Sequence, residues 1–261
     1  MIRFTKPARA KGIIQRGYFS YITEGIIHIY NAKLNHPNED FKIYFDLFDI
    51  PGYLCGNIYD VCFVQDEEDY KSNFNSYTNI ELLNPIINFN AYDDTTFTKE
   101  IFETCELIIK KYLKLNDEMT NLFSSRHSQI DFTKTIGFHR RSTDMTRVHN
   151  VPTISLDNIF NILDKEEFEN IFLMSDNILD TNEFKKKYGN KLITFDELTS
   201  SNNEQPFFTF NNNEDSIKKH IQEIVFGAYT LGMTKKLICT KSNLSTFSIL
   251  SNSKLNYTRL N

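Results

Sequence analysis

The chain has 261 residues, a length that allows one large domain or two small ones. Its 34 acidic and 29 basic residues leave a net charge of −5, whereas proteins that grip a nucleic-acid backbone are usually basic, so we expect no nucleic-acid partner. Hydrophobic residues make up 40% of the chain, which is enough for a sizeable core and excludes wholesale disorder. With only 9 glycines, the composition also argues against a Gly-rich phosphate loop.

Targeting and metal-binding signals are not evident in the sequence. The first residues lack the apolar run of a signal peptide, and no stretch reaches the roughly 18–20 apolar residues of a membrane span. We therefore expect a cytoplasmic protein without a membrane span. The 4 cysteines form no CxxC pair, and we expect no metal site.

In the first half, the apolar pattern predicts alternating short strands and helices. The expected elements are a turn at 16–20, a helix with apolar residues at helical spacing between 22 and 30, a strand at 41–48, a second strand at 59–64, polar loops at 66–94 and an amphipathic helix at 101–114. A polar stretch at 116–131, with a short helix at 119–123, predicts a boundary between an acceptor-side domain (1–125) and a nucleotide-binding domain (126–261).

The second half is more regular. The expected strands are at 135–138, 170–174, 191–195 and 237–239, and the expected helices are at 156–163, 183–188, 216–231 and 244–251. Asp180, three residues before Glu183, resembles the cap of the second of these helices. Strands that alternate with helices predict an α/β fold with a parallel sheet covered on both faces, which binds ligands beyond the carboxyl ends of its strands.

The most informative segment is 135–144, TIGFHRRSTD, in which an apolar strand runs directly into a histidine, two arginines, two hydroxyls and an aspartate. Arginine suits a diphosphate because its planar fork donates two parallel, charge-assisted hydrogen bonds. The alternative is a solvated loop with an ion pair between an arginine and Asp144.

A second segment has complementary chemistry. The apolar run LICT (237–240) leads into KSNLSTFS (241–248), a hydroxyl-rich turn that opens a helix. Backbone N–H groups at a helix N-terminus bind anions without glycines, although the same pattern also describes an ordinary helix cap. Together, the two strand ends would offer an arginine fork and a helix N-terminus, as a nucleotide diphosphate requires.

At this point the sequence resembles a known group. FHRRSTD (138–144) looks like the HxRRxD-type motif of the fucosyltransferase superfamily, STFS (245–248) is similar to its phosphate-holding element, and FLMSDN (172–177) resembles the strand end between them. Order and spacing agree over about residues 134–252, whereas the first half matches only in general plan. The resemblance implies a GT-B-like fold of two Rossmann-type halves with parallel sheets, the second of which holds GDP-fucose.

The resemblance also implies roles for individual residues. Arg141 matches the arginine that binds the β-phosphate and steadies the departing GDP, and His139 matches the histidine that faces the nucleoside. Ser142 stands where many members have a second arginine, and Glu223 stands near the position of an aspartate that often contacts guanine, which leaves the donor base open. The implied donor-binding residues are His139, Arg140, Ser142, Asp144, Asp176, Glu223, Ser245, Thr246, Phe247 and Ser248.

The catalytic base has two candidates. His149 lies five residues after the motif aspartate, where the α1,6-type enzymes have a glutamate, and a histidine suits a base near neutral pH. A surface histidine is the alternative interpretation of that position. Asp46, from the first half, is the second candidate for a catalytic role beside Arg141.

The predicted function is therefore an inverting glycosyltransferase that moves fucose from GDP-fucose to a hydroxyl of a glycan or protein acceptor, without a metal or another cofactor. Its expected partners are a nucleotide sugar and a glycan or glycoprotein. Three alternatives stay open: the same fold with a different nucleotide-sugar donor, a non-catalytic relative that binds a nucleotide or a glycan, and an unrelated doubly wound protein.

Overall fold

The computed structural model describes residues 2–5, 17–38, 43–47, 56–65, 78–79, 97–142, 154–195 and 213–260, and all structural statements concern these residues. The strands in chain order are β1 (Ile2–Thr5), β2 (Ile43–Asp46), β3 (Thr78–Asn79), β4 (Thr135–Arg140), β5 (Asn170–Ser175), β6 (Leu192–Ile193), β7 (Lys236–Thr240) and β8 (Tyr257–Leu260). The helices are α1 (Tyr18–Asn35), α3 (Lys99–Tyr112), α4 (Asp117–His127), α6 (Leu156–Leu163), α7 (Ile178–Tyr188), α8 (Glu214–Met233) and α9 (Asn243–Leu250), with a 3-10 turn η3 (Gly189–Lys191).

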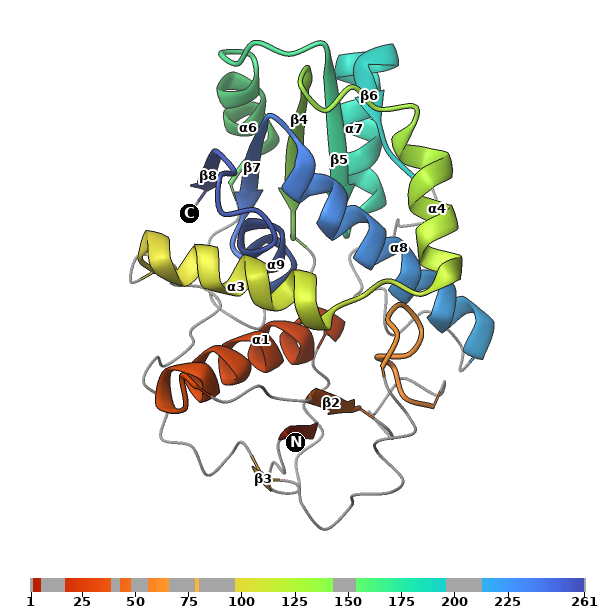
Figure 1. Cartoon of the computed structure of the whole chain (residues 1–261). Coiled ribbons are helices and arrows are strands. Elements are labelled where there is room, and N and C mark those ends of the chain that lie inside the picture. The colour runs from red at the N-terminus through yellow and green to blue at the C-terminus, as the bar shows by residue number, and fades with distance from the viewer. Residues whose placement is uncertain are drawn as a thin grey trace.

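The larger sheet is parallel throughout and has the order β6-β5-β4-β7-β8, with β4 at its centre (Figure 1). Every residue of β4 is buried, as expected of a parallel strand covered on both faces. On one face, Phe138 stacks on Phe184 of α7 with ring centroids 5.1 Å apart. On the other face, α8 approaches so closely that a Cβ at Gly137 would lie 2.8 Å from Thr234 Oγ1, which explains the glycine.

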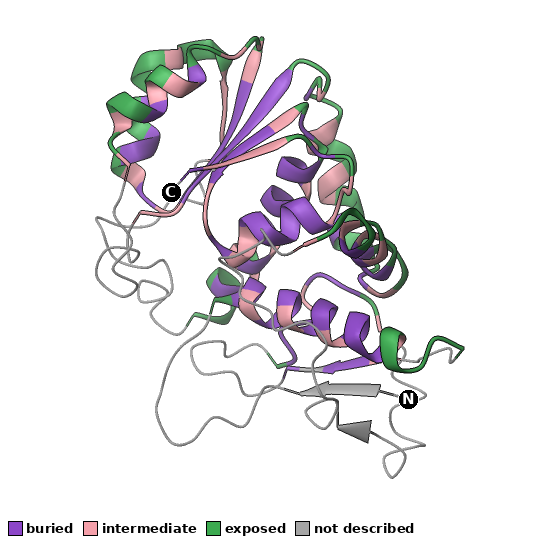
Figure 2. Cartoon of the chain, turned by 90° about the vertical axis from the view of Figure 1, so that its left-hand side faces the viewer, coloured by how far each residue is buried: buried purple, intermediate pink, exposed green. Residues whose placement is uncertain are grey.

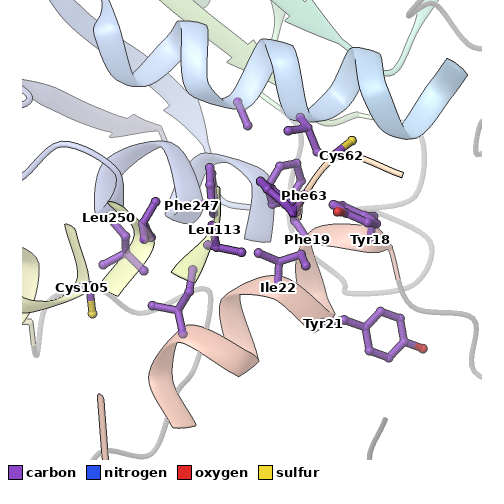
Figure 3. Packing of buried hydrophobic residues seen from close by; sticks show 14 of the residues in the cluster. Tyr18, Phe19, Tyr21, Ile22, Cys62, Phe63, Cys105, Leu113, Phe247 and Leu250 are labelled. Atoms are coloured by element: carbon purple, nitrogen blue, oxygen red, sulfur yellow. The ribbon is translucent and has the colours of Figure 1, made fainter. Parts of the chain in front are cut away.

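The first half of the chain forms a second, smaller parallel sheet with the order β2-β1-β3. Helix α1 packs against Phe45 of β2 on one side and against α3 and α9 on the other, with buried side chains along much of its length (Figure 2). One hydrophobic cluster runs from α1 and α3 into α8 and α9, and Phe19 and Ile22 of α1 lie close to Phe247 and Leu250 of α9 (Figure 3). The two halves therefore share a continuous core.

The structure confirms the predicted α/β class, and the expected strands and helices of the second half are all present. The strand expected at 59–64 is wrong: these residues form turns, with an isolated bridge between Phe63 and Leu115. The side chains of Tyr59, Cys62 and Phe63 reach the core from these turns, whereas Val64 is exposed. The side chain of Asn57 holds the bend, accepting from the N–H groups of Leu47 and Tyr59.

Several boundaries also differ from the sequence prediction. The strand at 191–195 shortens to Leu192–Ile193, and α1 begins at Tyr18, inside the expected turn. Helix α7 begins at Ile178 with Asn177 as its cap, so the predicted capping role of Asp180 is wrong. The predicted boundary between residues 125 and 126 falls inside α4, and the division into two domains stays a prediction. None of the helices in the described ranges is both long and apolar enough to cross a membrane.

Candidate active site

The candidate site lies at the carboxyl edge of the larger sheet, where β4, β5 and β7 end side by side. Backbone contacts tie the three strand ends together. The N–H of Arg141 donates to Thr240 Oγ1 at 2.8 Å, and the N–H of Ser142 donates to Asp176 Oδ1 at 2.9 Å. The structure therefore brings together three segments that are far apart in the sequence, at the edge where such sheets bind ligands.

Arg140, the last residue of β4, points to the α7 face and is enclosed there. Its Nε lies 2.8 Å from Asp180 Oδ2, and the side chains of Arg140 and Asp180 are only 10% and 8% exposed. The hydroxyl of Ser142 donates to the same carboxylate oxygen at 2.8 Å. Burial lowers the pKa of Arg140, while the nearby carboxylates of Asp180 and Asp176 oppose that shift. The charge of Arg140 is thus balanced by a carboxylate, and the pair fixes the end of β4 to the first turn of α7.

His139 is buried on the opposite face of β4, next to the start of α9. Its Nδ1 lies 3.5 Å from Ser242 Oγ. Burial, together with the positive charges of Arg141 and Arg259, lowers the pKa of His139 to about 3. The imidazole is therefore neutral near pH 7, and it can take part in hydrogen bonds without adding a charge to the site.

Helix α9 begins with a reciprocal capping box at the same edge. Ser242 Oγ accepts from the N–H of Ser245 at 3.0 Å, and Ser245 Oγ accepts from the N–H of Ser242 at 3.1 Å. The N–H groups of Asn243 and Leu244, also in the first turn, have no acceptor within the helix. Such N–H groups, with the positive end of the helix dipole, can hold an anion.

The hydroxyls of the predicted phosphate-binding turn are used inside the turn. Thr246 Oγ1 donates to the carbonyl of Ser242 at 3.0 Å, Ser245 Oγ donates to that of Thr240 at 2.9 Å, and Ser248 Oγ donates to that of Leu244 at 3.1 Å. These contacts brace the start of α9. Direct contact of these hydroxyls with a donor stays a prediction.

Two other predicted donor-binding residues have partners within the protein. Phe247 is fully buried, with ring centroids 4.8 Å from Phe19 and 5.1 Å from Tyr229. Glu223, buried in α8, accepts from Arg126 of α4 through both oxygens, at 2.6 and 2.9 Å. The structure thus places Glu223 in a bidentate ion pair, and its contact with a nucleotide base stays a prediction.

Of the remaining predicted residues, Asp46 is the last residue of β2, and Asp144 and His149 lie outside the described residues. Their catalytic and binding roles stay predictions. Within the described ranges, no group of three or more His, Cys, Asp or Glu side chains is arranged to hold a metal ion.

Arg259 of β8 also lies at this edge, and it was not among the residues predicted from the sequence. Its Nη2 donates to Thr246 Oγ1 at 3.0 Å, and its Nη1 donates to Ser245 Oγ at 3.4 Å, so the guanidinium lies against the first turn of α9. The signal that could have found it is the position of the short run 257–260 shortly after the last predicted helix, where the alternation of strands and helices calls for another strand.

A large parallel sheet with a polar carboxyl edge and a second, smaller parallel sheet are typical of the GT-B class, which the sequence motifs predicted. No family model matches the sequence, and no curated protein matches it. Solved structures with a similar fold include fucosyltransferases. The structure of NodZ α-1,6-fucosyltransferase soaked with GDP-fucose has a TM-score of 0.58 and 11% identity, over 96% of this chain and 92% of that chain.

Two further NodZ structures agree with this match. The enzyme co-crystallized with GDP has a TM-score of 0.56 and 11% identity over 96% of this chain and 90% of its own. NodZ from Bradyrhizobium has a TM-score of 0.55 and 10% identity, over 96% and 92%. At these identities the likeness establishes the fold, and it confirms the predicted GT-B-like architecture.

Proposed function

We propose that this chain is a glycosyltransferase that transfers fucose from GDP-fucose to a hydroxyl of a glycan or protein acceptor. The observation that carries the proposal is the position of Arg141 beside the end of β7, two residues before the cap of α9, where the backbone N–H of Arg141 donates to Thr240 Oγ1. A guanidinium and a helix N-terminus at one sheet edge suit a diphosphate. NodZ, which was soaked with GDP-fucose, has the same fold and supports this choice of donor.

The proposed reaction is an inverting displacement at the anomeric carbon of the sugar. The acceptor oxygen forms a bond to this carbon while the bond from the carbon to the β-phosphate oxygen breaks and GDP leaves. Negative charge then grows on the β-phosphate, where Arg141 and the free N–H groups of the first turn of α9 stabilise it. We assign the cationic role to these groups and propose that no metal is required.

A base must remove the proton of the acceptor hydroxyl, a contribution of typically 10²–10⁴-fold. His149 is our first candidate for this base and Asp46 is the second. His139 is unsuited to exchange protons near pH 7, because its burial lowers its pKa to about 3.

One observation favours a second candidate function, transfer from a different nucleotide sugar. Both oxygens of Glu223 already accept from Arg126, whose guanidinium also lies 4.3 Å from the ring centre of Phe195. A carboxylate held in this way has less capacity to accept hydrogen bonds from the N–H groups of guanine. The alternative predicts that the chain binds UDP as tightly as GDP or more tightly, whereas the main proposal predicts a preference for GDP.

Calorimetric titration with GDP, followed by an assay of sugar release and transfer from GDP-fucose, tests the proposal. We expect Arg141→Ala to lower turnover at least about a hundredfold, because one oxyanion-stabilising group is lost, with an unchanged circular dichroism spectrum. Lys235→Ala, an exposed change at the opposite end of β7, is the matched control and retains activity. Unchanged turnover in Arg141→Ala would contradict the proposal, and binding of GDP without sugar release would support a non-catalytic relative.

Activity that survives a chelator would support the metal-free mechanism. Loss of activity in the chelator, restored by added divalent cation, would contradict it.

A further inference from the structure

The carboxylate of Asp180 contacts the residues on both sides of Arg141. Its Oδ2 lies 2.8 Å from Nε of Arg140 and accepts from the hydroxyl of Ser142, also at 2.8 Å. Asp180 belongs to the first turn of α7, where the helix dipole favours a negative charge. A single carboxylate oxygen of α7 therefore holds two residues of the chain at the carboxyl end of β4.

These two contacts determine the direction of the residue between them. Successive side chains of an extended chain point to opposite faces. Because Arg140 and Ser142 both reach Asp180 on the α7 face, the side chain of Arg141 extends toward the opposite face, which α9 covers. The electrostatics agree, since the charge of Arg141 contributes to lowering the pKa of His139, which is buried on that face. The hold on residues 140 and 142 thus aims Arg141 at the α9 side of the sheet edge.

The backbone of the same three residues is fixed by the neighbouring strand ends. The N–H of Arg141 donates at 2.8 Å to Oγ1 of Thr240, the last residue of β7. The N–H of Ser142 donates at 2.9 Å to Oδ1 of Asp176, which directly follows β5. The segment is therefore held on both sides within the sheet, and Asp180 adds the contacts that hold its side chains.

The ion pair between Arg140 and Asp180 is not arranged for stability alone. Nη1 of Arg140 is buried and has no hydrogen-bond partner among the described residues. A buried donor without an acceptor destabilises the fold, and a buried ion pair can often be replaced by apolar side chains without loss of stability. Local costs of this kind are expected at functional sites, where geometry is retained at the expense of stability.

We infer that Asp180 is a positioning residue of the proposed diphosphate site, which aims the guanidinium of Arg141 by holding Arg140 and Ser142. The inference rests on the proposed function, and it deepens that function by naming a residue that lies outside the segments 138–144, 172–177 and 245–248. Asp180 acts through Arg141 and needs no contact with the ligand.

Calorimetric binding of inorganic pyrophosphate to the full chain tests this role in Asp180→Asn, Ser142→Ala and the control Asp157→Asn. Asp157 is an exposed acid in the first turn of α6, so its variant makes the same change of charge in another helix. We expect Asp180→Asn to weaken binding about tenfold and Ser142→Ala about threefold, because each loosens the hold on Arg141. Asp157→Asn should stay within about twofold of the unmodified chain, because solvent and salt screen an exposed charge.

The direction of the change in Asp180→Asn separates positioning from charge balance. If Asp180 only neutralised Arg140, the asparagine would release a positive charge beside the site, and pyrophosphate would bind more tightly. Tighter or unchanged binding in Asp180→Asn would therefore overturn the inference and leave the proposed function intact. An unmodified chain that bound neither pyrophosphate nor GDP would overturn both.

A double variant decides the question if Asp180→Asn does not fold. Arg140→Met combined with Asp180→Leu replaces the buried pair with apolar side chains, and we expect its urea midpoint to stay within about 0.5 M of that of the unmodified chain. Its pyrophosphate binding should still be about tenfold weaker, because the hydroxyl of Ser142 has lost its acceptor. Normal binding by this double variant, or by Ser142→Ala, would overturn the inference.

Discussion

At the carboxyl end of the larger sheet, two arginines on opposite faces are held by different chemistry. Arg140, on the α7 face, bonds to the carboxylate of Asp180, whereas Arg259, on the α9 face, donates to the hydroxyls of Ser245 and Thr246. The carboxylate balances the charge of Arg140, and the two hydroxyls hold the guanidinium of Arg259 against the first turn of α9. The difference teaches that the number of arginines in a motif does not give the number of positive charges available to a ligand. A motif arginine such as Arg140 can be paired with a carboxylate of the protein itself.

The largest expected effect is a loss of stability caused by a substitution on the α7 face. Asp180→Ala leaves the guanidinium of Arg140 buried without its carboxylate, and we expect the free energy of unfolding to fall by about 3–5 kcal/mol. Urea unfolding followed by circular dichroism measures this loss. Asp157→Ala is the matched control, since Asp157 is an exposed acid in the first turn of α6 and should cost about 0.5 kcal/mol. Equal losses in the two variants would contradict the distinction between the faces.

The second effect concerns His139 on the α9 face. Its native pKa of about 3 lies below the ordinary value of 6.5, so between these values the unfolded chain binds a proton that the native chain does not. This histidine therefore stabilises the fold fully above pH 6.5, and the contribution is lost as the pH falls toward 3. We expect the free energy of unfolding of His139→Gln to fall less steeply with acidification than that of the unmodified chain, by up to about 1.4 kcal/mol per pH unit.

Urea unfolding at pH 7, 6 and 5 measures this slope, and a constant destabilisation by the substitution does not affect it. If the free energy of unfolding fell equally steeply with pH in the two chains, His139 would have an ordinary pKa in the native state. That outcome would contradict the burial of His139 in a positively charged environment.

The smallest effect compares two helix caps. Ser242→Ala breaks the capping box of α9, and Ser155→Ala removes the cap of α6, where the Ser155 hydroxyl accepts from the N–H of Asn158. Each change should cost about 1 kcal/mol in urea unfolding. We expect only Ser242→Ala to weaken pyrophosphate binding as well, because only α9 begins at the proposed site. Equal binding by both variants would separate the α9 cap from the ligand.

The sequence was sufficient to predict the elements of the second half other than β8, because their apolar residues are periodic. It also placed Arg141 and Ser242–Ser245 at one edge through the alternation of strands and helices. It could not predict that Arg140 is buried and paired with a carboxylate. That pairing depends on Asp180, 40 residues away, and on the face of β4 to which each side chain points. Arg259 was missed for a related reason. Strand β8 has only four residues, and its position beside β7 is set by a pairing register that local patterns do not reveal.

The prediction for 59–64 failed because burial there does not follow strand periodicity. Tyr59, Cys62 and Phe63 are all buried, but they reach the core from successive turns that Asn57 anchors. A short apolar run alone does not distinguish such a bend from a strand.

The packing of Phe247 between Phe19 and Tyr229 has an evolutionary consequence. These three rings come from α9, α1 and α8, and each fills space that the other two leave, so a change of volume at one requires a compensating change at another. Among homologues, positions 19, 229 and 247 should vary together. The phenylalanine of the STFS segment should accordingly vary with its aromatic neighbours, independently of the ligand that a given homologue binds.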